Sequence, residues 1–306
     1  MTAVGWKKAR VLVFRHFVAA AAVVFLSTCR SPTDASASDP GIVLFEGSIS
    51  GGQLVVTSPD GAVHQPILDM FGAGAIQPRW SPDGGRISFY RAPYPYWQGV
   101  PSPGLFVINA DGSGLHEIAP GKSIGTADWS PDGNELVAYS GDSLVMVRLS
   151  DEAITPLPVK NAYPYDPFRS ISWSPDGNHI LYNGFVQGQS ELEVFDIATG
   201  TSRSLVSSAS NGRWSPDGSR IAYGSGAGRG WPSNVVVMSS DGSNPLTLTS
   251  DPDNFPDLTW SPDGKRLAFV IGCCPSYLAS MPATGGKLSQ LLDDPAPTFP
   301  DWRRTR

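Results

Sequence analysis

The sequence predicts an all-β fold, a six-bladed β-propeller with four-stranded blades, and three observations predict it. The pentapeptide Trp-Ser-Pro-Asp-Gly occurs five times unchanged, with its tryptophans 41 to 49 residues apart, close to the length of one four-stranded propeller blade. The chain is rich in turn formers, with 33 Gly and 28 Pro among 306 residues. It is also 41% hydrophobic with 9 Trp, which is too apolar for a disordered chain.

The first two strands of each blade follow from the pentapeptide. In Ser-Pro-Asp-Gly, proline presets φ, aspartate bonds to its own backbone, and glycine takes the positive φ that closes a hairpin. The tryptophan therefore ends a first strand, and the second strand begins two residues after the glycine. These second strands, for example residues 86–89 and 266–269, are apolar on both faces, as expected for a sheet packed between two neighbours.

The third and fourth strands are predicted from the next turn signals. Third strands over residues 105–109, 192–197 and 235–238 each lead into a glycine-containing turn. A shorter and more polar fourth strand follows, for example residues 245–249.

The sixth blade is predicted to be split between the two ends of the chain. Residues 42–45, 53–57 and 63–68 read as second, third and fourth strands without a first strand before them. A degenerate sixth copy of the repeat, Phe299-Pro300-Asp301-Trp302, supplies a first strand that no second, third or fourth strand follows. Together they complete a propeller over residues 41–306, in which ring closure removes exposed sheet edges.

The tryptophan of every repeat is expected to be structural. A tryptophan at the same place in each blade is best explained by packing between blades. These residues are Trp80, Trp129, Trp173, Trp214, Trp260 and Trp302.

The N-terminus predicts export. Residues 1–28 read as a signal peptide, because four basic residues precede an apolar run over residues 17–26 that is too short to span a bilayer. Leu26-Ser27-Thr28-Cys29 resembles a lipobox, which implies lipidation of Cys29 as the first mature residue, and residues 29–40 read as a flexible tether. The alternatives are ordinary cleavage near Ala35-Ser36-Ala37, which would discard Cys29, and an uncleaved anchor. The expected location is the bacterial cell envelope, lipid-anchored or secreted and periplasmic.

The charge of the mature chain limits its partners. Residues 1–28 contain no acidic residue, so the formal charge of −6 for the whole chain becomes −10 without them. An acidic domain without a basic run predicts no nucleic-acid partner, and a membrane contact only through the lipid at Cys29.

The repeats are similar to the propeller of the TolB-like family. Five Trp-Ser-Pro-Asp-Gly copies, each followed by an apolar strand and a second glycine turn, resemble that family from about Gly41 to Arg306. The resemblance implies a periplasmic or surface role in protein interaction. We expect the chain to lack the separate α/β domain that precedes the propeller in TolB itself, because little room precedes Gly41.

A binding surface is predicted on one face of the ring. The uniform turns share a face with the connections between third and fourth strands, so the irregular connections all fall on the opposite face. Aromatic residues interleaved with Pro and Gly there are typical of a binding surface. They are Tyr94, Tyr96, Trp97, Tyr163, Tyr165, Phe168, Trp231 and Tyr277.

The remaining candidate groups predict neither a metal site nor a cofactor. His64, His116 and His179 are spread over three repeats, without the clustering that metal ligation needs. The acidic loop with Asp251, Asp253 and Asp257 lacks the glycine and distal glutamate of an EF-hand, which favours a solvated loop over the alternative, a calcium site.

The adjacent pair Cys273 and Cys274 leaves two alternatives open. They form a vicinal disulfide in an oxidising compartment, or they are two buried free thiols.

The predicted function is binding without catalysis. We expect a monomeric propeller that engages an envelope protein, peptide or glycan through the aromatic face and the mouth of the central channel. The alternative is a propeller-type enzyme, either polysaccharide lyase-like or peptidase-associated. The lyase version requires Arg91, Arg169, Arg229 or the histidines to converge on the channel.

Overall fold

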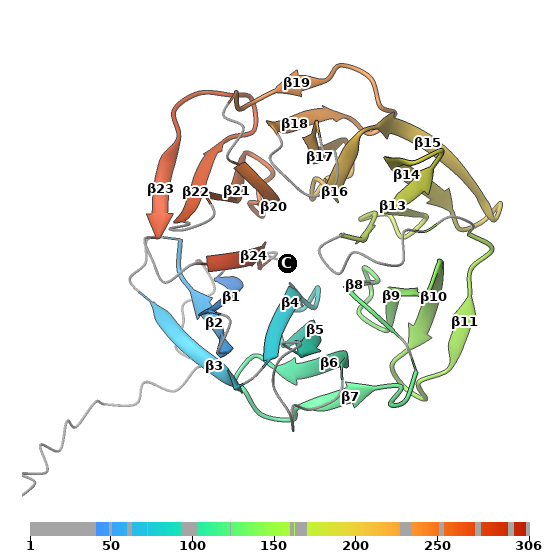
Figure 1. The fold of residues 1–306 in the computed structure, drawn as a ribbon, viewed down its shortest axis with the longest axis vertical. Coiled ribbons are helices and arrows are strands. Elements are labelled where there is room, and N and C mark those ends of the chain that lie inside the picture. Colours follow the sequence, from blue (N-terminus) through green and yellow to red (C-terminus); the bar gives the residue numbers. More distant parts are fainter. Residues whose placement is uncertain are drawn as a thin grey trace, which may run out of the picture. The chain divides into compact units, whose positions relative to one another are not determined.

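Six four-stranded antiparallel sheets stand as blades around a central axis in the computed structural model of the chain (Figure 1). The described residues are 41–48, 51–59, 63–71, 73–93, 103–122, 124–159, 162, 170–226, 234–250, 254–272, 277–292 and 297–303. The predicted all-β, six-bladed fold with four-stranded blades is confirmed. Within these residues no helix is long and apolar enough to cross a membrane.

Five blades each use four consecutive strands, which run from the innermost strand to the outermost. Blade 1 is β4 (Ala73–Trp80), β5 (Arg86–Pro93), β6 (Gly104–Asn109) and β7 (His116–Ile118). Blade 2 is β8 (Ala127–Trp129), β9 (Glu135–Ser140), β10 (Ser143–Arg148) and β11 (Ile154–Pro156). Blade 3 is β12 (Ser172–Trp173), β13 (His179–Val186), β14 (Gln189–Asp196) and β15 (Thr201–Ser207). Blade 4 is β16 (Ala209–Trp214), β17 (Arg220–Ser225), β18 (Asn234–Ser239) and β19 (Leu246–Thr247). Blade 5 is β20 (Asn254–Trp260), β21 (Arg266–Ile271), β22 (Tyr277–Pro282) and β23 (Ser289–Leu292).

Blade 6 joins the two ends of the propeller, as the sequence predicts. Its sheet has the order β24 (Pro297–Trp302), β1 (Ile42–Ser48), β2 (Gly51–Thr57) and β3 (His64–Phe71). Ile42 pairs with Trp302 in this sheet. The backbone amide of Arg303 then donates a 2.9 Å hydrogen bond to the carbonyl oxygen of Gly41.

Two strands differ in length from the prediction. The second strand predicted over residues 86–89 continues to Pro93, because β4 provides ladder partners as far as Ala73. The fourth strand predicted over residues 245–249 contains only Leu246–Thr247, at the outer edge of its blade. Outer strands have one neighbour, and few contacts fix their ends.

The hydrophobic core consists of six clusters, one at each interface between adjacent blades. The cluster between blades 6 and 1, for example, includes Phe45, Met70, Trp80 and Phe89. Every cluster contains one repeat tryptophan, and these side chains are 3 to 9% exposed. Each blade therefore packs on its neighbour around an indole ring.

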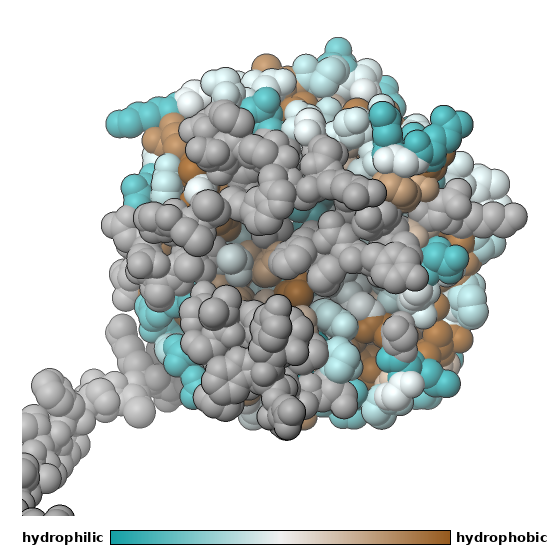
Figure 2. All heavy atoms as spheres, in the orientation of Figure 1, coloured by the Kyte–Doolittle hydropathy of each residue, from teal (hydrophilic) through white to brown (hydrophobic). Residues whose placement is uncertain are grey.

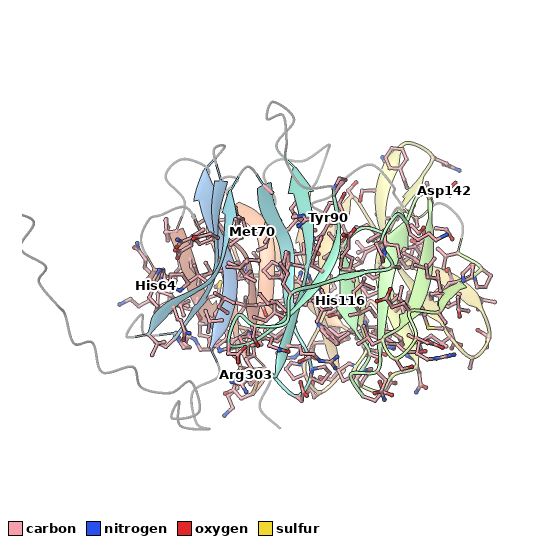
Figure 3. All side chains as sticks on the ribbon, turned by 90° about the horizontal axis from the view of Figure 1, so that it is seen from below. His64, Met70, Tyr90, His116, Asp142 and Arg303 are labelled. Carbon is pink, nitrogen blue, oxygen red and sulfur yellow. The ribbon has the colours of Figure 1, made fainter. Side chains whose placement is uncertain are left out.

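The antiparallel order gives the ring two different faces. We call the face with the five Ser-Pro-Asp-Gly turns and Arg303 the turn face. The opposite face, where second strands connect to third strands, is the loop face. Arg303 and Asp142, which lies in the β9–β10 turn, appear toward opposite edges of the disc in Figure 3. Hydrophilic and hydrophobic residues are interspersed around the edge of the molecule in Figure 2.

Candidate functional site

The residue before each repeat tryptophan lies at the wall of the central channel. All six are polar and form what we call the channel ring: Arg79, Asp128, Ser172, Arg213, Thr259 and Asp301. All six border a cavity of about 40 Å³, together with repeat tryptophans and the turn prolines Pro82 and Pro216. The cavity therefore lies at the turn-face end of the channel.

Four members of the channel ring connect their blade to the next one. The Asp128 carboxylate accepts a 2.8 Å hydrogen bond from the backbone amide of Trp173. Asp301 and Thr259 accept equivalent bonds of 2.9 and 3.0 Å from the amides of the following tryptophans. Ser172 makes a longer one, 3.4 Å, to the amide of Trp214. A small acceptor at this position thus links adjacent first strands.

An arginine side chain cannot accept a hydrogen bond. At Arg79 and Arg213 a different hydrogen bond therefore joins the blade to the next one. The indole Nε1 of Trp129 donates to the carbonyl oxygen of Arg79 at 3.1 Å, and that of Trp260 donates to the carbonyl of Arg213 at the same distance. In both blades an arginine of the second strand also lies over the next indole. The Arg86 guanidinium is 4.8 Å from the ring centre of Trp129, within the range of cation–π attraction.

Arg79 and Arg213 meet at one oxygen atom. Blades 1 and 4 stand opposite each other in the ring (Figure 1). The Nη2 atoms of Arg79 and Arg213 lie 3.2 and 3.4 Å from Oε1 of Gln77. Arg79 is 4% exposed and Arg213 is 6% exposed. The channel is therefore bridged from side to side by two buried guanidinium groups and one amide.

The backbone at Gln77 departs from regular strand geometry. Its φ is +50°, in the left-handed region that L-residues rarely adopt. The β4–β5 register shifts between Ile76 and Arg79, so Gln77 lies in a β-bulge. Asn211 has the same place in blade 4, with φ of +54°. Bulges re-aim side chains next to functional sites, and this one directs Gln77 toward both arginines.

The repeated turns form one hydrogen-bond pattern five times. The serine hydroxyl donates to the aspartate Oδ1 at 2.5 to 2.6 Å and accepts from the amide five residues on at 2.9 Å. The glycines have φ of 66 to 78°, as the turn chemistry predicts. The hydrogen bond from Ser130 lowers the pKa of Asp132. The uniform turns are thus explained by local structure.

Most residues of the predicted aromatic surface lie outside the described residues. These are Tyr94, Tyr96, Trp97, Tyr163, Tyr165, Phe168 and Trp231. Tyr277 is the first residue of β22 and packs, partly buried, against the cluster between blades 4 and 5. Cys29, Cys273 and Cys274 also lie outside the described residues, as do the proposed signal peptide and tether.

The three described histidines occupy separate surface sites. His116 Nε2 is 2.6 Å from Oε1 of Glu152, and this hydrogen bond lowers the pKa of Glu152. His64 lies 3.3 Å from Glu46. His64 and His116 belong to β3 and β7, which are outermost strands of their blades and lie away from the axis (Figure 1). His179 lies 3.7 Å from each of its two carboxylates.

The arrangement required by a lyase is not found in the part of the chain that the structure describes. The histidines do not converge, and no group of three His, Cys, Asp or Glu residues able to hold a metal ion occurs there. The Arg91 guanidinium lies over the ring of Phe106, 3.9 Å from its centre. Arg169 and Arg229 lie outside the described residues.

Fold and site together define a six-bladed propeller with a polar, bridged channel. Residues 161–285 match the family model described as the TolB beta propeller domain. The chain is therefore similar to that family over these residues. It is 43% identical over 85 residues to the Tol-Pal system protein TolB of Anaeromyxobacter dehalogenans strain 2CP-C. That match covers 27% of this chain and 19% of the relative, so it spans about a fifth of that protein's length.

Solved structures share the fold at low identity. The crystal structure of TolB from Acinetobacter baumannii aligns with a TM-score of 0.74 and 18% identity, over 87% of this chain and 67% of that one. An oligogalacturonate lyase in complex with manganese aligns with a TM-score of 0.53 and 16% identity, over 84% of this chain and 74% of that one. At these identities the likeness concerns the fold alone.

The channel ring was not predicted from the sequence. The signal was present, because the residue before each repeat tryptophan is polar in all six copies. Recognising it requires aligning the repeats on the tryptophan and asking which neighbouring position faces the axis.

Proposed function

We propose that this protein is a non-enzymatic binding propeller of the bacterial cell envelope. It holds an envelope protein, peptide or glycan on its loop face, at the mouth of the central channel. The observation that carries the proposal is the TolB-type propeller domain, matched over residues 161–285 and related in sequence to a protein named for the Tol-Pal system.

The two faces of the ring support the choice of binding surface. The turn face is built from five copies of one hydrogen-bonded turn, which varies little from blade to blade. The connections between second and third strands and those from one blade to the next differ in length, and they carry the predicted aromatic residues. Functional residues concentrate on variable loops held by a uniform scaffold.

Attachment to the envelope is proposed through Cys29. The basic residues, the apolar run and Leu26-Ser27-Thr28-Cys29 support a lipidated N-terminus followed by a tether. Intact-mass analysis of the protein from a bacterial membrane fraction tests this point. We expect a chain that begins at Cys29 with attached acyl groups, and an unlipidated chain that begins near Ser38 would contradict it.

Photocrosslinking tests the proposed function directly. A photoreactive amino acid is placed at Trp97 on a loop-face connection or, as a matched control, at Asp132 in a turn, and the full chain is crosslinked in its native envelope. We expect one reproducible adduct from position 97 and none from position 132. The same adduct from position 132 alone would contradict the proposal.

A further inference from the structure

Two buried cations converge at the turn-face end of the channel. A guanidinium group carries five N–H donors, and the side-chain hydrogen bonds of Arg213 reach only neutral oxygens, of Ile171 and Gln77. No carboxylate lies within ion-pair distance of Arg213 in the described part of the chain, although its side chain is only 6% exposed. Burying a cation without a counterion is unfavourable.

Donors without acceptors surround the same cavity. Nε of Arg79 and the indole Nε1 atoms of Trp80, Trp214 and Trp302 are buried and have no hydrogen-bond partner among the described residues. All four residues line the cavity of about 40 Å³. Buried polar atoms are almost always hydrogen-bonded in folded proteins. All four atoms are donors, so the structure around this end of the channel has more buried donors than acceptors.

The size and charge of the cavity define the ligand. A volume of about 40 Å³ has room for roughly three water-sized groups, which suits a carboxylate. Arginine pairs with carboxylates through parallel N–H bonds. We propose that Arg79 and Arg213 form a carboxylate-binding site at the turn-face end of the channel, and that its ligand is the acidic side chain or C-terminal carboxylate of a peptide.

The two acids of the channel ring are already engaged. Asp128 accepts from the amide of Trp173, and Asp301 accepts from the amide of Trp80. Asp301 also lies 3.9 Å from Arg79. These bonds hold both carboxylates at the blade interfaces. Gln77 orients the two guanidinium groups from the other side, because it is not among the residues that line the cavity.

Tryptophan fluorescence provides the readout, because five indoles line the cavity. The full chain is titrated with sodium acetate against sodium chloride at equal ionic strength. It is then titrated with an end-blocked peptide containing one internal glutamate, and with an acetylated glycine peptide that has a free C-terminus. We expect saturable binding of acetate and of at least one peptide. The better-bound peptide identifies the source of the carboxylate.

Two variants make the test decisive. Arg213→Gln should weaken acetate binding at least tenfold, whereas the control Arg148→Gln, which alters an exposed ion pair with Asp151, should not change it. Gln77→Glu supplies a built-in carboxylate to the same two arginines. It should raise Tm by about 2 °C or more and abolish the acetate response.

A linear, non-saturable response to acetate would mean that the cavity holds water only, and it would overturn the proposal. Equal acetate affinity in Arg213→Gln would do the same. If Arg213→Gln does not fold, the Gln77→Glu variant decides, and a lower Tm for that variant refutes the site. The site is at the opposite end of the channel from the loop face, so it can fail without affecting the proposed function.

Discussion

The backbone amide of Trp80 donates a 2.9 Å hydrogen bond to the carboxylate of Asp301, which lies 221 residues later in the chain. This bond joins the first complete blade to the strand that completes the split one. Arg303 adds a second contact across the same interface, with its guanidinium 5.4 Å from the ring centre of Trp80. The ring is thus closed by the same kind of link that joins blades 2 and 3.

Deletion of residues 299–306 should open the ring. It removes most of β24, which is the inner neighbour of β1 and packs Trp302 against the cluster between blades 5 and 6. We expect a loss of several kcal/mol, a large fraction of the ~5–15 kcal/mol typical of folded domains. Chemical denaturation measures it. A truncated protein that melts within about 2 °C of the full chain would show that the closure contributes little.

Single substitutions isolate the interblade link. Asp301→Ala leaves the buried amide of Trp80 without its acceptor and should cost about 1–3 kcal/mol. Asp128→Ala removes the matching bond to Trp173, 2.8 Å long, at an internal interface. We expect similar losses in urea unfolding for both variants. A cost confined to Asp128→Ala would show that the closing interface does not depend on this bond.

A glycine beside the channel should be intolerant of any side chain. A Cβ on Gly212 would lie 2.6 Å from Leu192 and 2.7 Å from Leu181, both fully buried. Gly212→Ala should therefore destabilise by about 1–3 kcal/mol through overpacking. Gly125→Ala is the control, because its nearest neighbours would lie at 3.7 Å. Equal unfolding midpoints for the two variants would contradict this packing.

The turn aspartates should contribute to acid sensitivity. Hydrogen bonds from Ser130 and Ser215 lower the pKa of Asp132 and Asp217. A lowered pKa means that the stabilisation is complete above the unfolded value of about 3.9 and is lost as the pH falls through the folded value. The double variant Asp132→Asn, Asp217→Asn should have a lower Tm than wild type at pH 7. The difference should shrink toward pH 3, and a constant difference would count against the assignment.

Glu193 should show the opposite pH dependence. Burial raises its pKa, and its carboxylate accepts a 2.5 Å hydrogen bond from the hydroxyl of Tyr182. A raised pKa gives stabilisation that is complete below the unfolded value of about 4.3 and is lost as the pH rises through the folded value. Glu193→Gln should therefore gain in Tm relative to wild type between pH 4 and pH 7, by about 2 °C. Asp142→Asn removes an exposed carboxylate and should show no such gain.

The fold was predictable because its signals are local and repeated. Ser-Pro-Asp-Gly specifies a turn by its own chemistry, and the tryptophan before it marks the same strand end in each blade. The degenerate copy at Trp302 was enough to predict the split blade. Strand ends at the outer edges were less predictable, because no neighbouring strand determines them.

The channel was not predictable in the same way. Gln77 and Arg213 are 136 residues apart and meet only because blades 1 and 4 stand opposite each other. The left-handed φ of Gln77 arises from a bulge that no local motif announces. The polar residue before each tryptophan gives the composition of the channel ring. Which of these side chains meet depends on closure of the whole ring.

The most direct test of the binding account is the affinity of the loop-face variant for the partner captured from position 97. The triple variant Tyr96→Ala, Trp97→Ala, Trp231→Ala should bind that partner more weakly by at least about 2 kcal/mol if these residues are hot spots. Its Tm should stay close to that of wild type. A turn variant, Asp132→Asn with Asp217→Asn, should keep the affinity and lose stability. Unchanged affinity of the triple loop variant, with loss of binding by a turn variant of intact stability, would assign the binding surface to the turn face and contradict the account.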